Sequence, residues 1–264
     1  MRNLLITGGA GFIGSNFVQY WISNYPDDKI IVLDALTYAG NLENLAPIAD
    51  HINYSFVKGD IRNFGLVTKL LDENDVDIVV HFAAESHVDR SILGPQEFIE
   101  TNINGTFNLL ESVRKCWEKD SNKRFIHIST DEVYGSLDFD DPAFTEESQY
   151  KPNSPYSASK AGSDHLVRAY HRTYSVPAII THCSNNYGPY QFPEKLIPLM
   201  IFKAIRNEKL PVYGDGLNIR DWIYVLDHCR AIDFVIQKGN LGEVYNIGGD
   251  SEKHNIDTVK IILD

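Results

Sequence analysis

The stretch Gly8-Gly9-Ala10-Gly11-Phe12-Ile13-Gly14 decides the fold of this chain. It comes directly after the short apolar run Leu4–Thr7 and opens a segment with helical periodicity. Glycines at positions 8, 11 and 14 permit a tight turn, close approach of the backbone to a pyrophosphate, and tight packing of a helix against a strand. The helix N-terminus then supplies amides and a positive dipole to the phosphates. The stretch therefore predicts a dinucleotide-binding turn.

The next apolar run, Ile30–Asp34, ends on a carboxylate. A carboxylate at the end of the second strand of such a fold accepts hydrogen bonds from both hydroxyls of the adenosine ribose, and it would repel a 2′-phosphate. We therefore expect Asp34 to favour NAD over NADP as the cofactor.

Further apolar runs alternate with longer helical patterns, as in the βαβ units that build a parallel sheet. The clearest helical pattern runs from Pro95 to Lys119. Most of the apolar runs are rich in Ile and Val and apolar on both faces, as strands covered by helices on both sides should be. We expect an α/β fold with a Rossmann-type doubly wound parallel sheet. Its expected strands are Leu4–Thr7, Ile30–Asp34, Tyr54–Lys58, Ile78–Ala83, Phe125–Ser129 and Ala178–Cys183.

The sequence becomes richer in turn-forming residues after Ser184. We therefore expect residues 1–184 to form an NAD-binding domain. Residues 185–264 would form a smaller, C-terminal substrate-binding domain, from which some segments return to the first. The expected elements of this second domain are a helix over Lys195–Asn207, a short strand over Leu210–Tyr213 and a turn at Gly214–Gly216.

The composition is that of an ordinary soluble globular protein, with 43% hydrophobic and 23% charged residues. A formal net charge of -12 argues against a nucleic-acid partner, because a general nucleic-acid binder needs a basic surface. It does not argue against a nucleotide ligand, which backbone amides and one or two arginines can hold.

The three cysteines are far apart, and the three histidines within the expected strands are scattered, so we expect neither a disulfide framework nor a metal site. We find no signal peptide, and no stretch approaches the ~20 apolar residues of a membrane span. We expect a cytoplasmic protein without a membrane partner. The residues concerned are Cys116, Cys183, Cys229, His81, His127 and His182.

The segment Tyr156-Ser157-Ala158-Ser159-Lys160 follows Pro155 and opens a helix. The i to i+4 spacing places the phenol and the ammonium on one helix face, ~5–6 Å apart at the Cβ atoms. A free tyrosine titrates near ~10 and is a poor base at neutral pH. A lysine cation and a positive nicotinamide ring both favour the phenolate. The pattern is common on protein surfaces, but its place downstream of a dinucleotide turn favours Tyr156 as an acid–base group.

Asp131 and Glu132 come directly after the apolar run Phe125–Ser129. Ligands of open α/β sheets bind at the carboxyl ends of the strands. We therefore expect both carboxylates to face the reaction centre rather than to be solvated loop residues. One tyrosine is enough for the acid–base work of a dehydrogenation or an epimerisation. A neighbouring acid and base indicate an elimination as well, with one taking a carbon-bound proton and the other protonating a leaving hydroxyl.

Several motifs occur together along nearly the whole chain: Gly8–Gly14, Asp34–Asn41, Ala83–Ser91, Thr130–Glu132, Tyr156–Lys160, Asn185–Gln191, Arg220–Trp222 and Tyr245–Gly249. The set resembles the dTDP-glucose 4,6-dehydratases of the extended short-chain dehydrogenase/reductase superfamily. Single motifs are shared with sugar epimerases. The Thr130–Glu132 triplet together with Tyr38-Ala39-Gly40-Asn41 is much more specific to the dehydratases.

The resemblance implies a role for each matching residue. Catalysis would involve Thr130, Asp131, Glu132, Tyr156 and Lys160. The nucleotide-sugar substrate would contact Ser86, Thr130, Asn185, Lys195, Leu196, Pro211, Tyr213, Arg220 and Asn255. The NAD cofactor would contact Gly8, Gly11, Phe12, Ile13, Gly14, Asp34, Ala35, Leu36, Thr37, Asp60, Ile61, Phe82, Ala83, Ala84, Ser86, Thr101, Tyr156, Lys160 and Asn186.

The resemblance also implies a reaction, that of an NAD-dependent hydro-lyase. Tyr156 takes the proton of the sugar 4-hydroxyl while a hydride passes from C4 to NAD. Glu132 then removes the C5 proton and Asp131 protonates the departing 6-hydroxyl. Return of the hydride to C6 gives the 4-keto-6-deoxy sugar nucleotide and regenerates NAD, which should therefore stay tightly bound.

The family usually continues beyond Asp264 with a segment that closes the substrate domain, so we expect that domain to be incomplete here. Alternatives stay open: a sugar-nucleotide 4-epimerase, a dehydratase of another nucleotide sugar, or a non-catalytic NAD-binding homologue. The residues alone do not separate thymidine from uridine. In this family the Pro95–Lys119 helix joins a dimer interface, so its apolar stripe from Ile99 to Trp117 indicates a homodimer as well as an internal packing face.

Overall fold

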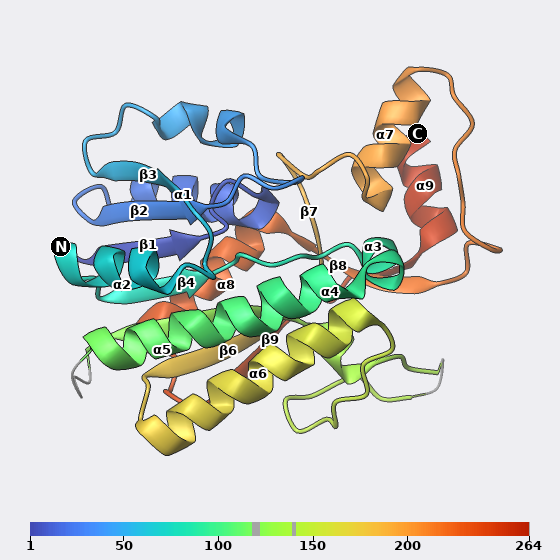
Figure 1. Ribbon diagram of the computed structural model, residues 1–264. Helices are drawn as coiled ribbons and strands as arrows, with labels where there is room; N and C mark the ends of the chain where they lie inside the picture. Colours follow the sequence, from blue (N-terminus) through green and yellow to red (C-terminus); the bar gives the residue numbers. More distant parts are fainter. Residues whose placement is uncertain (118–121, 139–140, 264) are drawn as a thin grey trace.

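The main sheet is parallel and seven-stranded, with the strand order β3-β2-β1-β4-β5-β6-β9 (Figure 1). The computed structural model describes residues 1–117, 122–138 and 141–263. The strand order reverses at the β1–β4 pair, the switch point at which doubly wound sheets bind ligands. The predicted α/β fold is confirmed. The strands are β1 (Asn3–Thr7), β2 (Lys29–Asp34), β3 (Tyr54–Lys58), β4 (Ile78–His81), β5 (Arg124–Thr130), β6 (Ala178–Cys183) and β9 (Val244–Ile247).

Helices cover both faces of this sheet, which explains the apolar strands. In β1, Leu4 and Ile6 point into one buried cluster and Leu5 into another, as the alternation of a strand requires. The first cluster lies under α1 (Phe12–Asn24) and α8 (Val225–Lys238). The second lies under α2 (Phe64–Glu73), α5 (Thr106–Cys116) and α6 (Pro155–Tyr174).

The helix predicted over Pro95–Lys119 begins where expected but is not uniform. It consists of α4 (Pro95–Phe98), a π-helical segment η2 (Ile99–Gly105) and α5. Residues 118–119 of the prediction lie outside the described residues. Along this helix Leu110 and Val113 are buried, whereas Ile99 and Phe107 are 43% and 46% exposed. The stripe is therefore only partly an internal packing face.

A second, three-stranded sheet and a helix pair lie beside the carboxyl ends of the main strands (Figure 1). The sheet contains β7 (Asn185–Tyr187), β8 (Ile219–Tyr224) and β10 (Glu252–His254), in the order β10-β8-β7. Helix α7 (Leu196–Ile205) packs against α9 (Asn255–Leu263). The helix predicted over Lys195–Asn207 is therefore confirmed, but it begins one residue later and ends two residues earlier than predicted. The short helices are η1 (Leu42–Ile48), α3 (Val88–Leu93) and η3 (Asp131–Tyr134).

The strand predicted over Leu210–Tyr213 is wrong, because this segment is irregular. Pro211 has no amide to donate to a ladder, and β8 already pairs with β7 on one side and β10 on the other. The turn predicted at Gly214–Gly216 is confirmed, and both of its glycines have positive φ.

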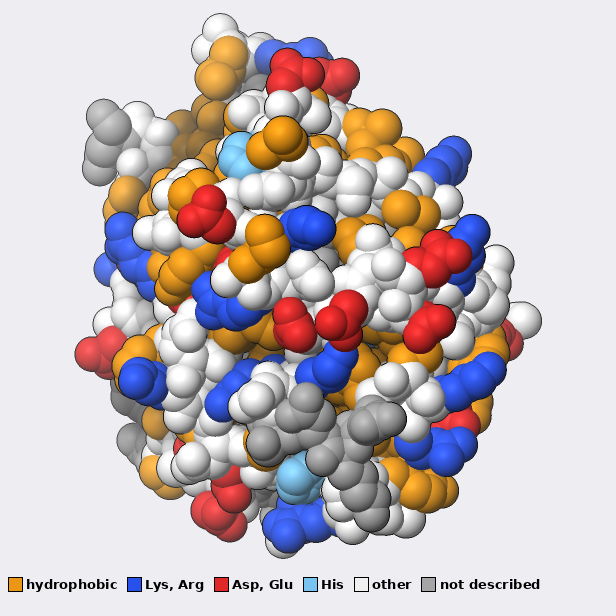
Figure 2. All heavy atoms as spheres, turned by 90° about the vertical axis from the view of Figure 1, so that its left-hand side faces the viewer, with side chains coloured by type: hydrophobic (Ala, Val, Ile, Leu, Met, Phe, Trp, Pro, Cys, Tyr) orange, Lys and Arg blue, Asp and Glu red, His pale blue; other side chains and the backbone are white. Residues whose placement is uncertain are grey.

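The side of the molecule that carries the N-terminus shows acidic, basic and apolar side chains interspersed (Figure 2). No continuous basic track is visible there among the side chains that are drawn in colour. None of the helices in the described part of the chain has the length and apolarity needed to cross a membrane.

Candidate active site

A cavity of about 530 Å³ lies along the carboxyl ends of the main strands and reaches the second sheet. Every predicted cofactor, substrate and catalytic residue lines it except Leu36 and Pro211. Leu36 packs against the core, and its amide donates to Asp34 Oδ1 over 2.8 Å. Pro211 is exposed on the irregular segment after α7. These two residues are therefore not lining residues of the cavity.

The glycine-rich turn between β1 and α1 forms one end of the cavity. Gly8 has φ +71°, and a Cβ there would lie 2.5 Å from the amide nitrogen of Ala83, so the turn packs directly on the segment after β4. A Cβ at Gly14 would collide with the carbonyl oxygen of Gly8. Gly11 is the N-cap of α1 and has no side chain to accept from the first amides of the helix, so these amides stay available to a ligand. A pyrophosphate fits this arrangement of open amides and absent side chains.

The carboxylate of Asp34 is fixed beside this turn. Its Oδ2 accepts from the amide of Ala10 at 2.9 Å and its Oδ1 from the amide of Leu36 at 2.8 Å. Burial raises the pKa of Asp34, and the two amide hydrogen bonds oppose that rise. Each carboxylate oxygen keeps a lone pair for a ribose hydroxyl, which suits an unphosphorylated adenosine ribose.

The two adjacent carboxylates follow β5 on the short helix η3. Thr130 caps this helix, because its Oγ1 accepts from the amide of Glu132 at 3.3 Å. Burial, followed by the charge of Glu132, raises the pKa of Asp131 to about 6. Burial also raises the pKa of Glu132, while the cations Lys195 and Arg220 lower it. The pair therefore consists of an acid that is partly protonated near neutral pH and a carboxylate with two cations around it.

Tyr156 and Lys160 come from the first turns of α6. Ser154 and Ser157 form a capping box and Pro155 occupies the first turn, which starts the helix at this point. Burial, with the charge of Glu132 adding to it, raises the pKa of the Tyr156 phenol well above its usual range. The side chain of Thr130 favours the phenolate of Tyr156 and so acts to lower the pKa of this phenol.

Lys160 is buried and its Nζ donates to the carbonyl of Ile128 at 2.9 Å. Burial lowers the pKa of this lysine, and the carboxylate of Asp164 opposes the change. The ammonium is thus held against the end of β5, where Tyr156, Thr130 and the carboxylate pair also meet.

The opposite wall of the cavity comes from the second sheet and the segment before α7. Lys195 Nζ donates to the carbonyl of Ser86 at 3.1 Å, and Arg220 lies on β8. Within the described residues, four buried polar atoms of this wall have no hydrogen-bond partner. Such atoms fit a polar ligand, because an unpaired buried group is costly. They are Ser184 Oγ, Gln191 Oε1, Trp222 Nε1 and Asn255 Oδ1.

Several lining residues were not predicted. Arg62 pairs with Asp60 at 2.7 Å and with Glu97 at 3.3 Å, next to Thr101. The adjacency of Arg62 to Asp60 was a usable signal, but the pairing with Glu97 depends on the fold. Other lining residues lie in or near the sequence motifs given above, but no role was predicted for them. They are Tyr38, Glu85, Gln191, Phe192, Glu194 and Trp222.

Comparison with known proteins identifies close relatives. The sequence model of the GDP-mannose 4,6 dehydratase family matches residues 5–264. A dTDP-glucose 4,6-dehydratase of Xanthomonas campestris pv. campestris (strain B100) is 58% identical over 267 residues, which cover 99% of this chain and 75% of that protein.

Solved structures extend the similarity to three dimensions. The dTDP-glucose 4,6-dehydratase of Bacillus anthracis, in complex with NAD, is 54% identical with a TM-score of 0.92, covering 100% of this chain and 80% of that one. The enzyme of the same name from Streptomyces venezuelae, with NAD and a second ligand bound, is 53% identical with a TM-score of 0.94 and the same coverage. The similarity therefore includes every segment that lines the cavity.

Proposed function

This chain belongs to the dTDP-glucose 4,6-dehydratase family, and on that premise we propose that it converts dTDP-glucose to dTDP-4-keto-6-deoxyglucose. The reaction removes water across C5 and C6 of the sugar and depends on NAD. The observation that carries the proposal is the meeting of three proton-transfer groups in one cavity: the phenol of Tyr156 and the carboxylates of Asp131 and Glu132.

Each of these groups has a distinct task in the elimination. Tyr156 accepts the proton of the sugar 4-hydroxyl, and the side chain of Thr130 favours its phenolate against the effect of burial. Glu132 takes the proton from C5, which the adjacent ketone makes acidic, and the charges of Lys195 and Arg220 favour its carboxylate form against the effect of burial. Asp131, whose pKa is raised by burial to about 6, donates a proton to the departing 6-hydroxyl, so that water leaves.

The cofactor position follows from the glycine turn and Asp34. The open amides at the start of α1 would hold the pyrophosphate, and the fixed carboxylate of Asp34 the adenosine ribose. The chemistry that bound NAD supplies is reversible hydride acceptance, which permits oxidation at C4 and reduction at C6 without net redox change. Lys160 orients this end of the site, because its ammonium is anchored to β5.

The substrate would lie between the carboxylate pair and the second sheet. Arg220 and Lys195, which line the cavity, would bind the diphosphate, and the unpaired atoms of Trp222 and Asn255 would offer further polar contacts. Discrimination of the base is tested by offering dTDP-glucose and UDP-glucose in parallel.

The experiment that tests the proposal follows water loss by mass spectrometry after NAD-loaded protein is mixed with dTDP-glucose. Glu132→Gln keeps the shape of the base but removes its charge, and we expect product formation to fall at least about 1000-fold, within the range of acid–base contributions. Glu73→Gln, on the exposed face of α2, is the matched control and should leave the rate unchanged. Folded, NAD-loaded protein that forms no product would refute the proposal.

A deuterium label separates the elimination from epimerisation. If Glu132 removes the C5 proton and solvent supplies its replacement, product made in D₂O carries deuterium at C5. A 4-epimerase leaves C5 untouched, so recovery of an unlabelled sugar of unchanged mass would favour that alternative. The adjacent pair Asp131–Glu132 is the feature that argues for elimination.

The same chain is proposed to form a homodimer in the cytoplasm. The support for a dimer is the apolar surface of η2 and α5, where Ile99 and Phe107 are exposed. The support for a reducing compartment is that the three cysteines are free.

We also propose the division into an NAD-binding domain over 1–184 and a substrate-binding domain over 185–264. From the second domain, β9 joins the main sheet and α8 packs on that sheet.

A further inference from the structure

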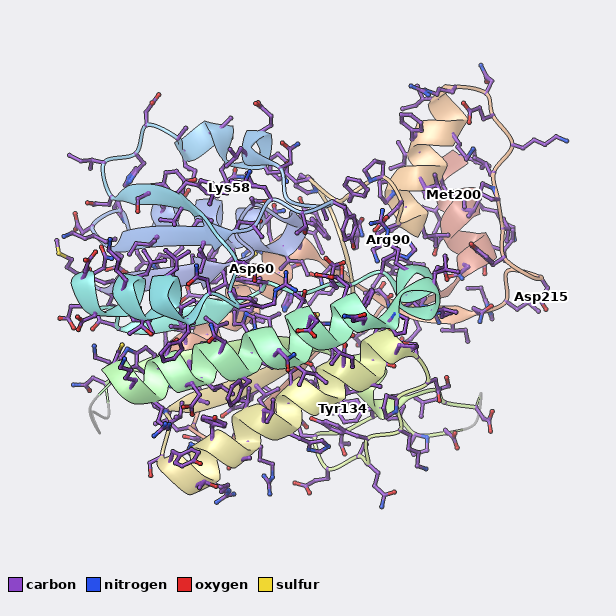
Figure 3. All side chains as sticks on the ribbon, in the orientation of Figure 1. Lys58, Asp60, Arg90, Tyr134, Met200 and Asp215 are labelled. Atoms are coloured by element: carbon purple, nitrogen blue, oxygen red, sulfur yellow. The ribbon has the colours of Figure 1, made fainter. Side chains whose placement is uncertain are left out.

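Arg90 lies between the strands β1–β3 and helix α7 (Figure 3). Its guanidinium stacks on the ring of Tyr38, with Cζ 3.9 Å from the ring centroid. Its Nη2 also lies 3.8 Å from Glu194 Oε2. Tyr38 follows β2, whereas Glu194 precedes α7, so one side chain connects two walls of the cavity.

Two further contacts strengthen this connection. The ring of Phe192 meets the ring of Tyr38 edge to face, with centroids 5.8 Å apart at 88°. His87 Nε2 lies 3.6 Å from the same oxygen of Glu194 that faces Arg90. The Glu194 side chain is 17% exposed and the Arg90 side chain 49% exposed, so water partly screens the interaction between them. Tyr38, Phe192 and Glu194 all line the cavity.

We propose that Tyr38, Arg90, Phe192 and Glu194 form a clasp that retains NAD throughout the catalytic cycle. Tyr38 stands in the segment that begins with Asp34, at the adenosine side, and Glu194 adjoins Lys195, at the substrate side. Arg90 joins the two walls from outside the lining of the cavity, so on this proposal a nucleotide between the walls leaves when its stacking on Tyr38 and its pairing with Glu194 are broken. The residues are positioning residues, because they act on access to the cavity rather than on the reacting atoms.

The need for such a clasp rests on the proposed function. A reaction without net oxidation begins and ends with the same form of its cofactor, so it requires one molecule to stay in place from start to finish. A dehydrogenase that exchanges its cofactor at each turnover has no such requirement. Tyr38 and Glu194 come from different walls, so the clasp can open without unfolding either sheet.

The test measures release of labelled NAD from the loaded protein during a chase with unlabelled NAD. We expect release to accelerate about fivefold in Arg90→Ala and about twofold in Glu194→Gln, as loss of a half-exposed stacked cation and of its screened ion pair implies. Tyr38→Phe keeps the ring and should release NAD at nearly the wild-type rate, whereas Tyr38→Leu should not. Arg230→Ala, which removes an exposed partner of Asp227 on α8, is the matched control.

A second readout separates retention from structural damage. Added NAD should restore the turnover of the Arg90 and Glu194 variants towards the wild-type rate, while their unfolding midpoints stay unchanged. Wild-type release rates in folded Arg90→Ala and Glu194→Gln would overturn the clasp. The isosteric Glu194→Gln decides the question if Arg90→Ala does not fold. A third outcome is that the variants release NAD faster but the wild-type protein forms no dehydrated product. That outcome would refute the proposed function and leave the clasp standing.

Discussion

Asp34 Oδ2 accepts a hydrogen bond from the backbone amide of Ala10 at 2.9 Å. This bond ties the end of β2 to the glycine-rich turn, and the amide of Leu36 fixes the other carboxylate oxygen. The carboxylate therefore needs little reordering to meet a ribose. Preorganisation of this kind increases affinity because little side-chain entropy is lost on binding.

Asp34→Asn should weaken NAD binding and relax the discrimination against NADP. The amide keeps the size of the side chain but loses the charge and one of the two acceptor oxygens. We expect the NAD dissociation constant to rise about 10- to 100-fold, as loss of a charged hydrogen bond implies. Calorimetric titration with both dinucleotides checks this. Asp50→Asn, at an exposed site, is the control. An unchanged ratio of the two affinities would contradict the assigned role of Asp34.

The charge of the half-buried Asp131 carboxylate should lower the stability of the protein at neutral pH, relative to a neutral side chain at the same position. Burial and Glu132 raise its pKa from 3.8 to about 6, so the folded state favours the protonated form. The stabilisation from that proton is complete below 3.8 and is lost as the pH rises through about 6. At pH 7.5, Asp131→Asn should therefore increase the free energy of unfolding by up to about 3 kcal/mol.

Urea unfolding of wild type and Asp131→Asn at several pH values tests this expectation. The advantage of the variant should shrink as the pH falls towards 4. The same variant should lose dehydration, since an amide cannot protonate the 6-hydroxyl. A difference in stability that does not change with pH would show that the charge of Asp131 is not the cause.

Local patterns were sufficient for most of the sheet and for the catalytic segments. The glycine turn, the predicted strand ends at Asp34 and Ser129, and the Tyr156–Lys160 spacing each combine a strand or helix signal with adjacent polar residues. Parallel strands expose their carboxyl ends at one edge, so assigning the strands also places these residues in one cavity. Family resemblance added the residues of the second sheet, whose short strands have weak patterns.

The features that were missed depend on contacts between distant segments. The π-helical segment η2 accompanies the bonds of Asn102 to both backbone groups of Glu85, a pairing that no local pattern reveals. Likewise, the stack of Arg90 on Tyr38 joins segments that only the fold brings together. The strand expected over Leu210–Tyr213 is wrong because this segment pairs with none of the described strands. The second sheet consists of β10, β8 and β7.

Gly8→Ala should be far more harmful than Gly214→Ala, although both glycines have positive φ. Each substitution strains the backbone by about 1–2 kcal/mol. At Gly214 a Cβ has no neighbour within 4 Å, whereas at Gly8 it would lie 2.5 Å from the Ala83 nitrogen and 2.7 Å from its Cα. We therefore expect a loss of roughly 3 kcal/mol or more for Gly8→Ala, together with weaker NAD binding. Denaturation curves with and without NAD decide this, and equal losses in the two variants would contradict the close packing of the turn.

Phe107→Glu should convert a dimer into monomers if the surface of η2 and α5 is the interface. Phe107 is 46% exposed and packs edge to face on the buried ring of Tyr170 on α6. A two-fold interface brings each residue near its own copy or its neighbours, so one charge per chain enters the interface twice. Phe234→Glu is a matched control, because Phe234 is 68% exposed on α8, which covers the opposite face of the main sheet. Sedimentation velocity should give half the wild-type mass for Phe107→Glu and the wild-type mass for Phe234→Glu. Dissociation by the Phe234 variant alone would place the interface on the α1–α8 face instead.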